Sequence, residues 1–504
     1  MRRGETFFYN VRLGESITNI LFEKGATGRG GSETRPIGIN LRDDKRDFFW
    51  QDSVVSARTC RRNPIETISQ LKNILHEQLG EEADRLGRES GFVQRERKLD
   101  GHSFVQALVF GFQANPASTY SELSQGLAMQ GKTISPQGLE QRFSEQSANF
   151  MQCVLESMVK VVIQGQSVAM PVIERFKGVY IRDSSIIGLP SCLKEIWRGN
   201  GTSQGESAAL KLQVCLNYST GQVEGPVLQA GRAHDHTSPF QHEELPAGAL
   251  RLADLGYFDL DCFVQDSQRG IYWISRLKTG TIVYDAIGRR LDLLAWLQAS
   301  DEIQRDVPIQ IGAKQLLPCR LIVQRVPQEV AEQRRRRLRD YARKKQVPLR
   351  EETLALAAWT LVITNISAES LSLDEILVVL RVRWQVELLF KLWKDRAKVD
   401  EWRSQNPWRI LTEIYAKLIG LIISQWIFQI ALWPFPNRSL ARAIRVIQKF
   451  APLIIFTFDD PSILLSVLER LYASLPVASR IDSRQSQPGT WQRLLECERL
   501  DGLC

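Results

Sequence analysis

The sequence predicts an α/β fold: a mixed sheet with helices, interrupted by an inserted antiparallel β domain and flanked by helical N- and C-terminal regions. Two patterns support this. Short apolar runs bounded by turn residues, which are typical of strands, concentrate between about residues 166 and 367. Apolar residues at helical spacing dominate the stretches before and after them. With 504 residues, the chain is long enough for two to four domains with sizeable cores.

Composition narrows the class of protein. Hydrophobic residues make up 43% and charged residues 24%, which is ordinary for a soluble globular protein. The net charge of +8 favours a polyanionic partner. Eight scattered cysteines form no C-x-x-C pair, which argues against a zinc ribbon or a disulfide framework and favours a reducing cytoplasm. Met1 precedes no long apolar run, so we expect no secretory signal. The apolar stretch 418–435 is expected to be a buried core helix and not a membrane span.

The N-terminal part divides in two. Residues 1–63 are atypical, rich in Gly, Arg, Ser and Thr, and we expect a disordered extension. Residues 64–165 are expected to form a helical DNA-binding domain. There, apolar residues recur at helical spacing up to Gly80, again over 104–112, and again in a helix that begins with Ser118.

A helix-turn-helix-like pair is predicted at the end of this domain. Ser135 offers an N-cap, and Pro136 suits the first helical position of a helix that runs to about Glu145. Gln141 and Arg142 on this helix are side chains that can reach bases or phosphates. The alternative is a plain helical bundle.

The catalytic domain is expected over residues 166–278 and 368–405. A strand containing Val179 and Ile181 ends at Asp183, and a short central strand over 250–253 ends at Asp254. A strand pair at 210–217 and 223–229 lies between them, and a further strand covers 271–277. Three strands, a helical stretch, a strand, a helix and a strand form the ribonuclease-H-like order.

An insertion separates Asp254 from the next candidate acid, Glu387, by 133 residues. Strand-like segments predict a β domain over residues 279–367, and they lie at 281–284, 309–311, 320–325 and 358–364. Residues 334–345 within it carry eight basic residues and one acid, so we expect a solvated arm that follows phosphates. An ordinary solvated helix is the alternative.

Residues 380–394, LRVRWQVELLFKLWK, are predicted to form one helix. Arg383, Glu387, Lys391 and Lys394 project from one stripe, and a single carboxylate among three cations suits a site that holds a divalent metal and phosphates. An amphipathic helix with i,i+4 salt links is the alternative. Four apolar side chains on the remaining faces suit burial: Val386, Leu389, Phe390 and Trp393.

This stretch resembles the signature of the insertion-sequence-four family of DDE transposases, Tyr-x2-Arg-x3-Glu-x6-Lys. Arg383, Glu387 and Lys394 match in type and spacing. Leu380 stands at the tyrosine position, so the phosphate contact of the tyrosine hydroxyl is in doubt here. Together with the strand-end acids, the resemblance covers roughly residues 65–475.

The resemblance implies chemistry and partners. Asp183, Asp254 and Glu387 would be catalytic ligands for Mg²⁺, with Mn²⁺ as a substitute, while Arg383 and Lys394 would bind the phosphates of the transposon end. Lys391 is added to the DNA-binding set from helix geometry. The partner would be double-stranded DNA, bound as transposon ends and target by a homodimer in a synaptic complex, with a hairpin intermediate. A tryptophan of the insertion can stack on a flipped base in this family, and three are candidates: Trp273, Trp296 and Trp359.

The leading functional hypothesis is therefore a cut-and-paste transposase, cytoplasmic and nucleoid-associated, without membrane contact. A catalytically inactive DNA-binding remnant or inhibitor of transposition is one alternative, and a structure-selective nuclease is another. The cluster of His234, His236 and His242 with Asp235 and Glu243 raises zinc as a weaker possibility. Residues 406–478 are expected to form a helical C-terminal region, and 479–504 a loosely held polar tail; the resemblance implies that this end of the chain supports subunit pairing.

Overall fold

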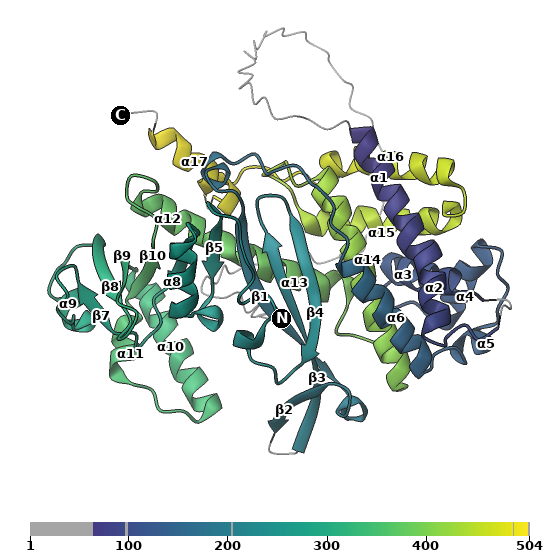
Figure 1. Ribbon diagram of the computed structural model, residues 1–504, viewed down its shortest axis with the longest axis horizontal. Helices are drawn as coiled ribbons and strands as arrows, with labels where there is room; N and C mark the ends of the chain where they lie inside the picture. The colour runs from purple at the N-terminus through teal and green to yellow at the C-terminus, as the bar shows by residue number, and fades with distance from the viewer. Residues whose placement is uncertain (1–63, 96–98, 203–204, 487, 502–504) are drawn as a thin grey trace, which may run out of the picture.

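The computed structural model describes residues 64–95, 99–202, 205–486 and 488–501, so the expected extension over 1–63 lies outside the described residues. A ten-stranded sheet runs through the middle of the molecule (Figure 1). Its strand order is β2-β3-β1-β5-β6-β10-β9-β8-β7, with β4 paired to β3. The inserted strands lie at one end of the molecule and a bundle of N- and C-terminal helices at the other. The predicted α/β class with helical flanks is confirmed.

The central strands have the ribonuclease-H-like arrangement: three antiparallel strands followed by two parallel ones. In chain order they are β1 (Val179–Leu189), β3 (Gly205–Asn217), β4 (Gln222–Ala230), β5 (Leu250–Ala253) and β6 (Tyr272–Arg276). Helix α8 (Leu260–Gln268) connects β5 to β6. The prediction of a helical stretch between β4 and β5 is wrong in its length, because only the 3₁₀ turn Asp235–Thr237 forms there.

Strand β1 differs from the prediction in its length. It does not end at Asp183 but continues to Leu189, because β3 pairs with it along Tyr180 to Leu189. A further strand, β2 (Arg198–Thr202), pairs with β3 and was not predicted. What ends near Asp183 is the pairing of β1 with β5, so the side chain lies at the edge of the parallel part of the sheet.

The insertion extends the central sheet. Strand β10 (Trp359–Thr364) pairs with both β6 and β9, so the predicted β segments continue the sheet. The remaining strands and helices of the insertion are β7 (Val283–Asp285), α9 (Leu293–Gln298), β8 (Gln304–Ile311), β9 (Leu317–Arg325), α10 (Gln328–Lys345) and α11 (Glu351–Leu356). These strands share a second apolar cluster, which is separate from the main core and includes Phe263 and Trp273.

The N-terminal helices differ from the prediction at two boundaries. Gly80 does not end the first helix, because a π-helical turn at Glu77–Glu81 carries the chain onward with Leu79 buried. Thr119, and not Ser118, caps the fourth helix through a capping box with Glu122. The six helices are α1 (Pro64–His76), α2 (Glu82–Glu89), α3 (Gly101–Ala114), α4 (Tyr120–Met129), α5 (Pro136–Glu140) and α6 (Glu145–Val159).

The C-terminal helices complete the bundle. Helix α14 (Pro407–Ala431) packs against α3 and α6, which joins the two ends of the chain. Among the described residues it is the one helix long and apolar enough to span a membrane, but its most apolar window is entirely buried, as predicted for a core helix. Helices α15 (Leu440–Thr457) and α16 (Pro461–Ala478) follow. The tail is not loosely held throughout, because α17 (Thr490–Asp501) packs with Leu494 fully buried.

Candidate active site

Two of the predicted acids meet because their strands are parallel neighbours. Strand β1 pairs with β5 in a register that sets Ile181 beside Leu252. Continued by two residues, this register sets Asp183 beside Asp254 on the same face of the sheet, since side chains alternate with a period of two. Neighbouring strands lie about 4.8 Å apart, so these two carboxylates share one edge of the sheet.

The third acid comes from a helix that packs on this face. The predicted single helix over 380–394 is wrong, because it is divided into α12 (Leu373–Leu380), a 3₁₀ turn at Arg381–Arg383 and α13 (Trp384–Ala397). Glu387 lies in the first turn of α13, and Arg383 directly precedes that helix. The predicted burial of four α13 side chains is confirmed for Val386, Leu389, Phe390 and Trp393. They anchor α13 against the main core.

Arg383 lies between the carboxylates. Its Nη2 donates to Glu387 Oε1 at 2.7 Å, and its Nη1 lies 3.6 Å from Asp254 Oδ1. Burial by itself would lower the pKa of the Arg383 guanidinium, but Asp254, Glu387 and Asp183 together raise it above its usual value. The guanidinium therefore contacts Glu387 and Asp254, and the charge of Asp183 stabilises it from farther away.

Asp183 is the acid of this site whose ionised form is least favourable. Burial raises its pKa to about 7, and the negative charges of Asp254 and Glu387 act in the same direction. The backbone N–H of Ser184, which donates to Asp183 Oδ1 at 2.8 Å, and the Arg383 guanidinium oppose this rise. One Arg does not compensate three converging carboxylates, so the site retains an unbalanced negative charge.

This donor set fits a divalent cation. Carboxylate oxygens are the ligands that Mg²⁺ prefers, and an excess of negative charge favours its binding. Among the described residues, the group whose ligand atoms all lie within 4.8 Å of one another is Asp84, Asp100 and His102. The three acids around Arg383 are not such a group. The carboxylate oxygens of the three acids around Arg383 are therefore spaced more widely than the ligand atoms of that group.

A stability measurement checks the strained state of Asp183. Its pKa is about 7 in the folded chain against a usual value of 3.8, so the folded state binds the proton more tightly between these values and stability falls as pH rises through this range. Without metal at pH 8, Asp183→Asn is expected to raise the free energy of unfolding by about 2–4 kcal/mol, with the gain vanishing towards pH 4. Urea denaturation in EDTA at pH 4.5 and 8 measures this. A variant no more stable than the wild type at pH 8 would contradict the raised pKa of Asp183.

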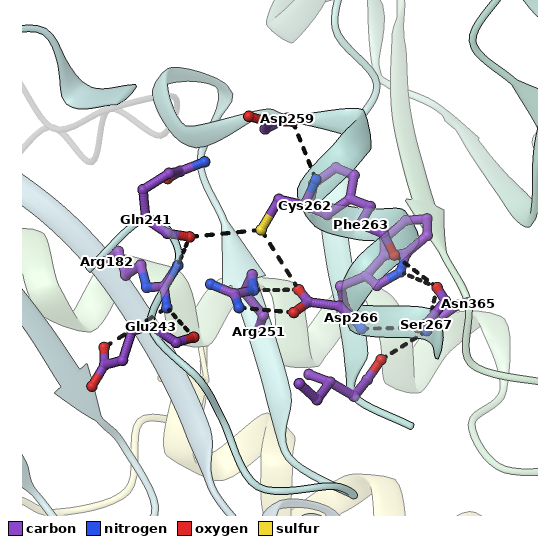
Figure 2. A network of polar contacts seen from close by, with 12 residues as sticks. Arg182, Gln241, Glu243, Arg251, Asp259, Cys262, Phe263, Asp266, Ser267 and Asn365 are labelled. Carbon is purple, nitrogen blue, oxygen red and sulfur yellow. Dashed lines mark hydrogen bonds and ion pairs between the residues drawn. The ribbon is translucent and has the colours of Figure 1, made fainter. Parts of the chain in front are cut away.

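A polar network supports the opposite face of the sheet (Figure 2). Arg182, whose side chain points away from that of Asp183, donates to the carbonyl of Gln241 at 2.8 Å and lies 3.8 Å from Glu243. Arg251 of β5 forms a buried ion pair with Asp266 of α8. Both arginines fix the strands that carry the acids, because a buried charge pair tolerates little displacement.

The predicted DNA-binding residues do not all join the acids. Lys394 donates to the carbonyl of Ile186 on β1 at 3.0 Å, close to the acidic edge. Lys391 is exposed and lines a separate cavity of about 550 Å³, between α13 and the segment before α17. Leu380 packs partly buried against the main core and offers no hydroxyl.

Gln141 and Arg142 lie elsewhere in the helical bundle. The predicted helix from Pro136 to about Glu145 is wrong in length, because α5 ends at Glu140 after five residues. The expected Ser135 cap is confirmed, since its side chain accepts from the Gly138 N–H. Gln141 and Arg142 follow α5 and line a cavity of about 340 Å³ with residues 91–95.

A large cationic cavity borders the acidic site on the side of the insertion. It measures about 1010 Å³, and Leu255, directly after Asp254, forms part of its wall. Six basic side chains line it: Arg276, Lys278, Arg290, Arg334, Arg337 and Arg350. Of the three candidate tryptophans, Trp359 lines this cavity, whereas Trp273 is fully buried and Trp296 stacks against Arg305.

The zinc possibility at the histidine cluster gains no support from the described side chains. Asp235 accepts hydrogen bonds from Ser184 and Lys211, and Glu243 faces Arg182. Sequence reasoning singled out Asp235 for this cluster and missed Lys211 entirely. The available signal was a lysine between two leucines in a buried strand, where an unpaired cation is costly.

The chain is similar in sequence to known transposases. The family described as transposase DDE domain matches residues 174–423. The transposase for insertion sequence element IS231F of Bacillus thuringiensis subsp. israelensis is 27% identical, over 80% of this chain and 89% of its own length. The transposase for IS1151 of Clostridium perfringens is 25% identical, over 69% and 77%. The cryo-EM structure of the piggyBac transposase synaptic complex with hairpin DNA aligns at a TM-score of 0.40 with 10% identity, over 83% of this chain and 82% of that one.

Proposed function

Because this chain is a DDE transposase, with a transposase DDE domain over residues 174–423, we propose that it binds the ends of its insertion sequence and cuts and joins DNA there with Mg²⁺. One observation carries the proposal: Asp183, Asp254 and Glu387 converge around Arg383 at one edge of the sheet. The proposed setting is the bacterial cytoplasm, in association with the nucleoid.

Each residue has a proposed role in the chemistry. Asp183, Asp254 and Glu387 would hold Mg²⁺, or Mn²⁺ in its place, which when bound activates the attacking oxygen and stabilises the leaving oxygen of a phosphodiester. Arg383 is poised to exchange one of its carboxylate partners for a phosphate of the DNA, because its planar guanidinium binds either anion in the same geometry. Lys394, at the rim of the site, would contact the next phosphate.

The cationic cavity is the proposed path for DNA beside the acids. Its basic rim suits a phosphate backbone, and Trp359 is the candidate tryptophan placed to meet a base there. Arg334 and Arg335 of α10 are not free for this task, because they bind backbone carbonyls of Trp359 and Leu354. The outward side of the same helix presents exposed cations that include Arg336, Arg339 and Lys344.

Neutralising these three exposed cations tests the arm. Replacing Arg336, Arg339 and Lys344 by Ala is expected to weaken binding to any duplex DNA and to reduce the slope of log K against log salt by about 2–3, since each lost phosphate contact removes roughly 0.9. Fluorescence anisotropy from 50 to 300 mM salt measures the slope. Helices α15 and α16 lie at the opposite end of the molecule (Figure 1), and their exposed residues Arg445, Lys449 and Arg470 form the matched control triple. An unchanged slope in the arm variant would exclude α10 from the interface.

The direct test of the function uses the full-length chain, a duplex carrying the element's end and a target plasmid. With Mg²⁺, we expect nicking at the end, a hairpin and then strand joining to the target, with two subunits in the synaptic complex. Tight end binding without nicking in Mg²⁺ or Mn²⁺ would instead identify an inactive DNA-binding protein or inhibitor. Cleavage without joining would identify a nuclease.

A further inference from the structure

Asp235 connects the backbone around Asp183 to a neighbouring loop. Its Oδ1 accepts a hydrogen bond from Ser184 Oγ at 2.8 Å. The backbone N–H of the same serine donates to Asp183 Oδ1 at 2.8 Å. Ser184 thus binds Asp235 through its hydroxyl on one face of the strand and Asp183 through its amide, so a shift of Asp235 is transmitted to Asp183.

Asp235 also reaches the backbone that follows Asp254. It opens the 3₁₀ turn Asp235–Thr237, which packs against the 3₁₀ turn Leu255–Tyr257. A Cβ on Gly256 would lie 3.1 Å from Asp235 Oδ2, which is closer than ordinary contact, so glycine permits this approach. Tyr257 closes the second turn by donating its hydroxyl to Gln213 of β3 at 2.7 Å.

Lys211 fixes Asp235 in this place. The Lys211 side chain extends from β3 and is almost fully buried. Its Nζ lies 2.7 Å from Asp235 Oδ1 and donates to the carbonyl of Ala233 at 2.6 Å. A buried ammonium requires a close anion, since its desolvation would otherwise be uncompensated. Because this pair depends on neither DNA nor metal, Asp235 is held in position before either binds.

We propose that Asp235 is a positioning residue for strand cleavage, an inference that rests on the proposed function of the site. Asp235 is not a fourth ligand, because Ser184, to which it binds, projects from the opposite face of β1 to Asp183. Through Ser184 it holds the segment that carries Asp183, and the turn that it begins packs against the turn after Asp254. It thereby sets the separation of the two aspartates.

Two variants test this role. Asp235→Asn keeps the side-chain shape but removes the charge facing Lys211, and Ser184→Ala removes only the link to β1. For each we expect kcat of end nicking to fall about 10–100-fold, which is typical when the support of a metal-binding residue is lost, with the Kd for DNA within twofold of the wild type. The double variant should be no slower than the slower single variant, since both act through one link. Asp301→Asn, at a fully exposed ion pair with Arg325, is the control and should nick normally.

Hydrogen exchange without metal provides a readout independent of activity. The peptide covering 183–188 is expected to exchange faster in both variants and the peptide covering 254–258 in Asp235→Asn, while peptides of α14 stay unchanged. A variant that unfolds more easily but nicks at the wild-type kcat once folded would show a purely structural role and overturn the proposal. Unchanged exchange in both peptides would also overturn it. If the wild-type chain does not nick DNA, the proposed function is contradicted. The exchange measurement would still test whether Asp235 stabilises the two segments, because it does not depend on activity.

Discussion

Asp183→Asn and Glu387→Gln are each expected to reduce Mg²⁺-dependent nicking of an end-containing duplex by at least about a thousandfold, with DNA binding retained. Each change removes one of the three carboxylates proposed to bind the metal, which leaves no spare acid to replace it. A metal stabilises transition-state charge by several kcal/mol, and about 4 kcal/mol corresponds to a thousandfold in rate. Single-turnover nicking assays with saturating enzyme measure this rate, and anisotropy measures binding.

The stability prediction for Asp183→Asn sharpens this test. Because that variant is expected to be more stable than the wild type without metal at pH 8, its inactivity could not be ascribed to unfolding. Asp261→Asn is a matched control at an acid of the first turn of α8, where the side chain contacts Gln315 in the insertion. Nicking at more than a tenth of the wild-type rate by either site variant would contradict the assignment of the acids.

Glu413→Ala is expected to lower the free energy of unfolding by about 3–5 kcal/mol, the largest stability effect we expect from one side chain. Glu413 is buried in α14 between two buried cations, with Oε1 2.8 Å from Lys417 Nζ and Oε2 3.8 Å from Arg409. Removing it leaves both charges without a carboxylate in the core. Lys417 also donates to the carbonyls of Lys398 and Glu401, just after α13, so the loss loosens the end of the helix that carries Glu387.

Urea denaturation of two further variants tests whether the uncompensated buried charge causes the loss of stability in Glu413→Ala. Glu89→Ala breaks an exposed ion pair with Arg85 and should cost less than about 1 kcal/mol. Glu413→Leu combined with Lys417→Met should be more stable than Glu413→Ala alone, because the double change removes the buried ammonium together with its partner. If the double variant is no more stable than Glu413→Ala, the uncompensated charge of Lys417 does not account for the loss.

Local patterns were sufficient to predict most elements of the sheet. The strands of the insertion follow the predicted segments to within a few residues, because alternating β-branched residues mark a pleated, half-buried strand wherever it pairs. What the patterns could not supply was the partner of each strand. β10 lies between β6 and β9, and β3 extends β1 beyond Asp183, through pairings between residues far apart in the chain.

For the helices too, local spacing predicted some features and tertiary packing decided the others. The apolar stripe of α13 and the Ser135 cap follow from the spacing of neighbouring residues, which acts within one or two turns. The break into α12, a 3₁₀ turn and α13 was missed, as was the continuation through Gly80, since tertiary packing decides whether a helix bends or ends. Helix α17 was missed because its sequence is polar and its burial depends on α7 (Pro171–Glu174) and α12.

The sequence by itself determined that Asp254 follows a short central strand, which face of α13 is buried and which family the chain resembles, because these depend on residue type and short spacing. Only the tertiary structure decided that Arg383 binds Asp254 and Glu387 at once, that one cationic cavity adjoins the site and that Lys211 holds Asp235. The physical reason is that an ion pair depends on distance in space, and residues 24 to 129 positions apart are brought together only by the packing of the sheet against α13 and the neighbouring turns.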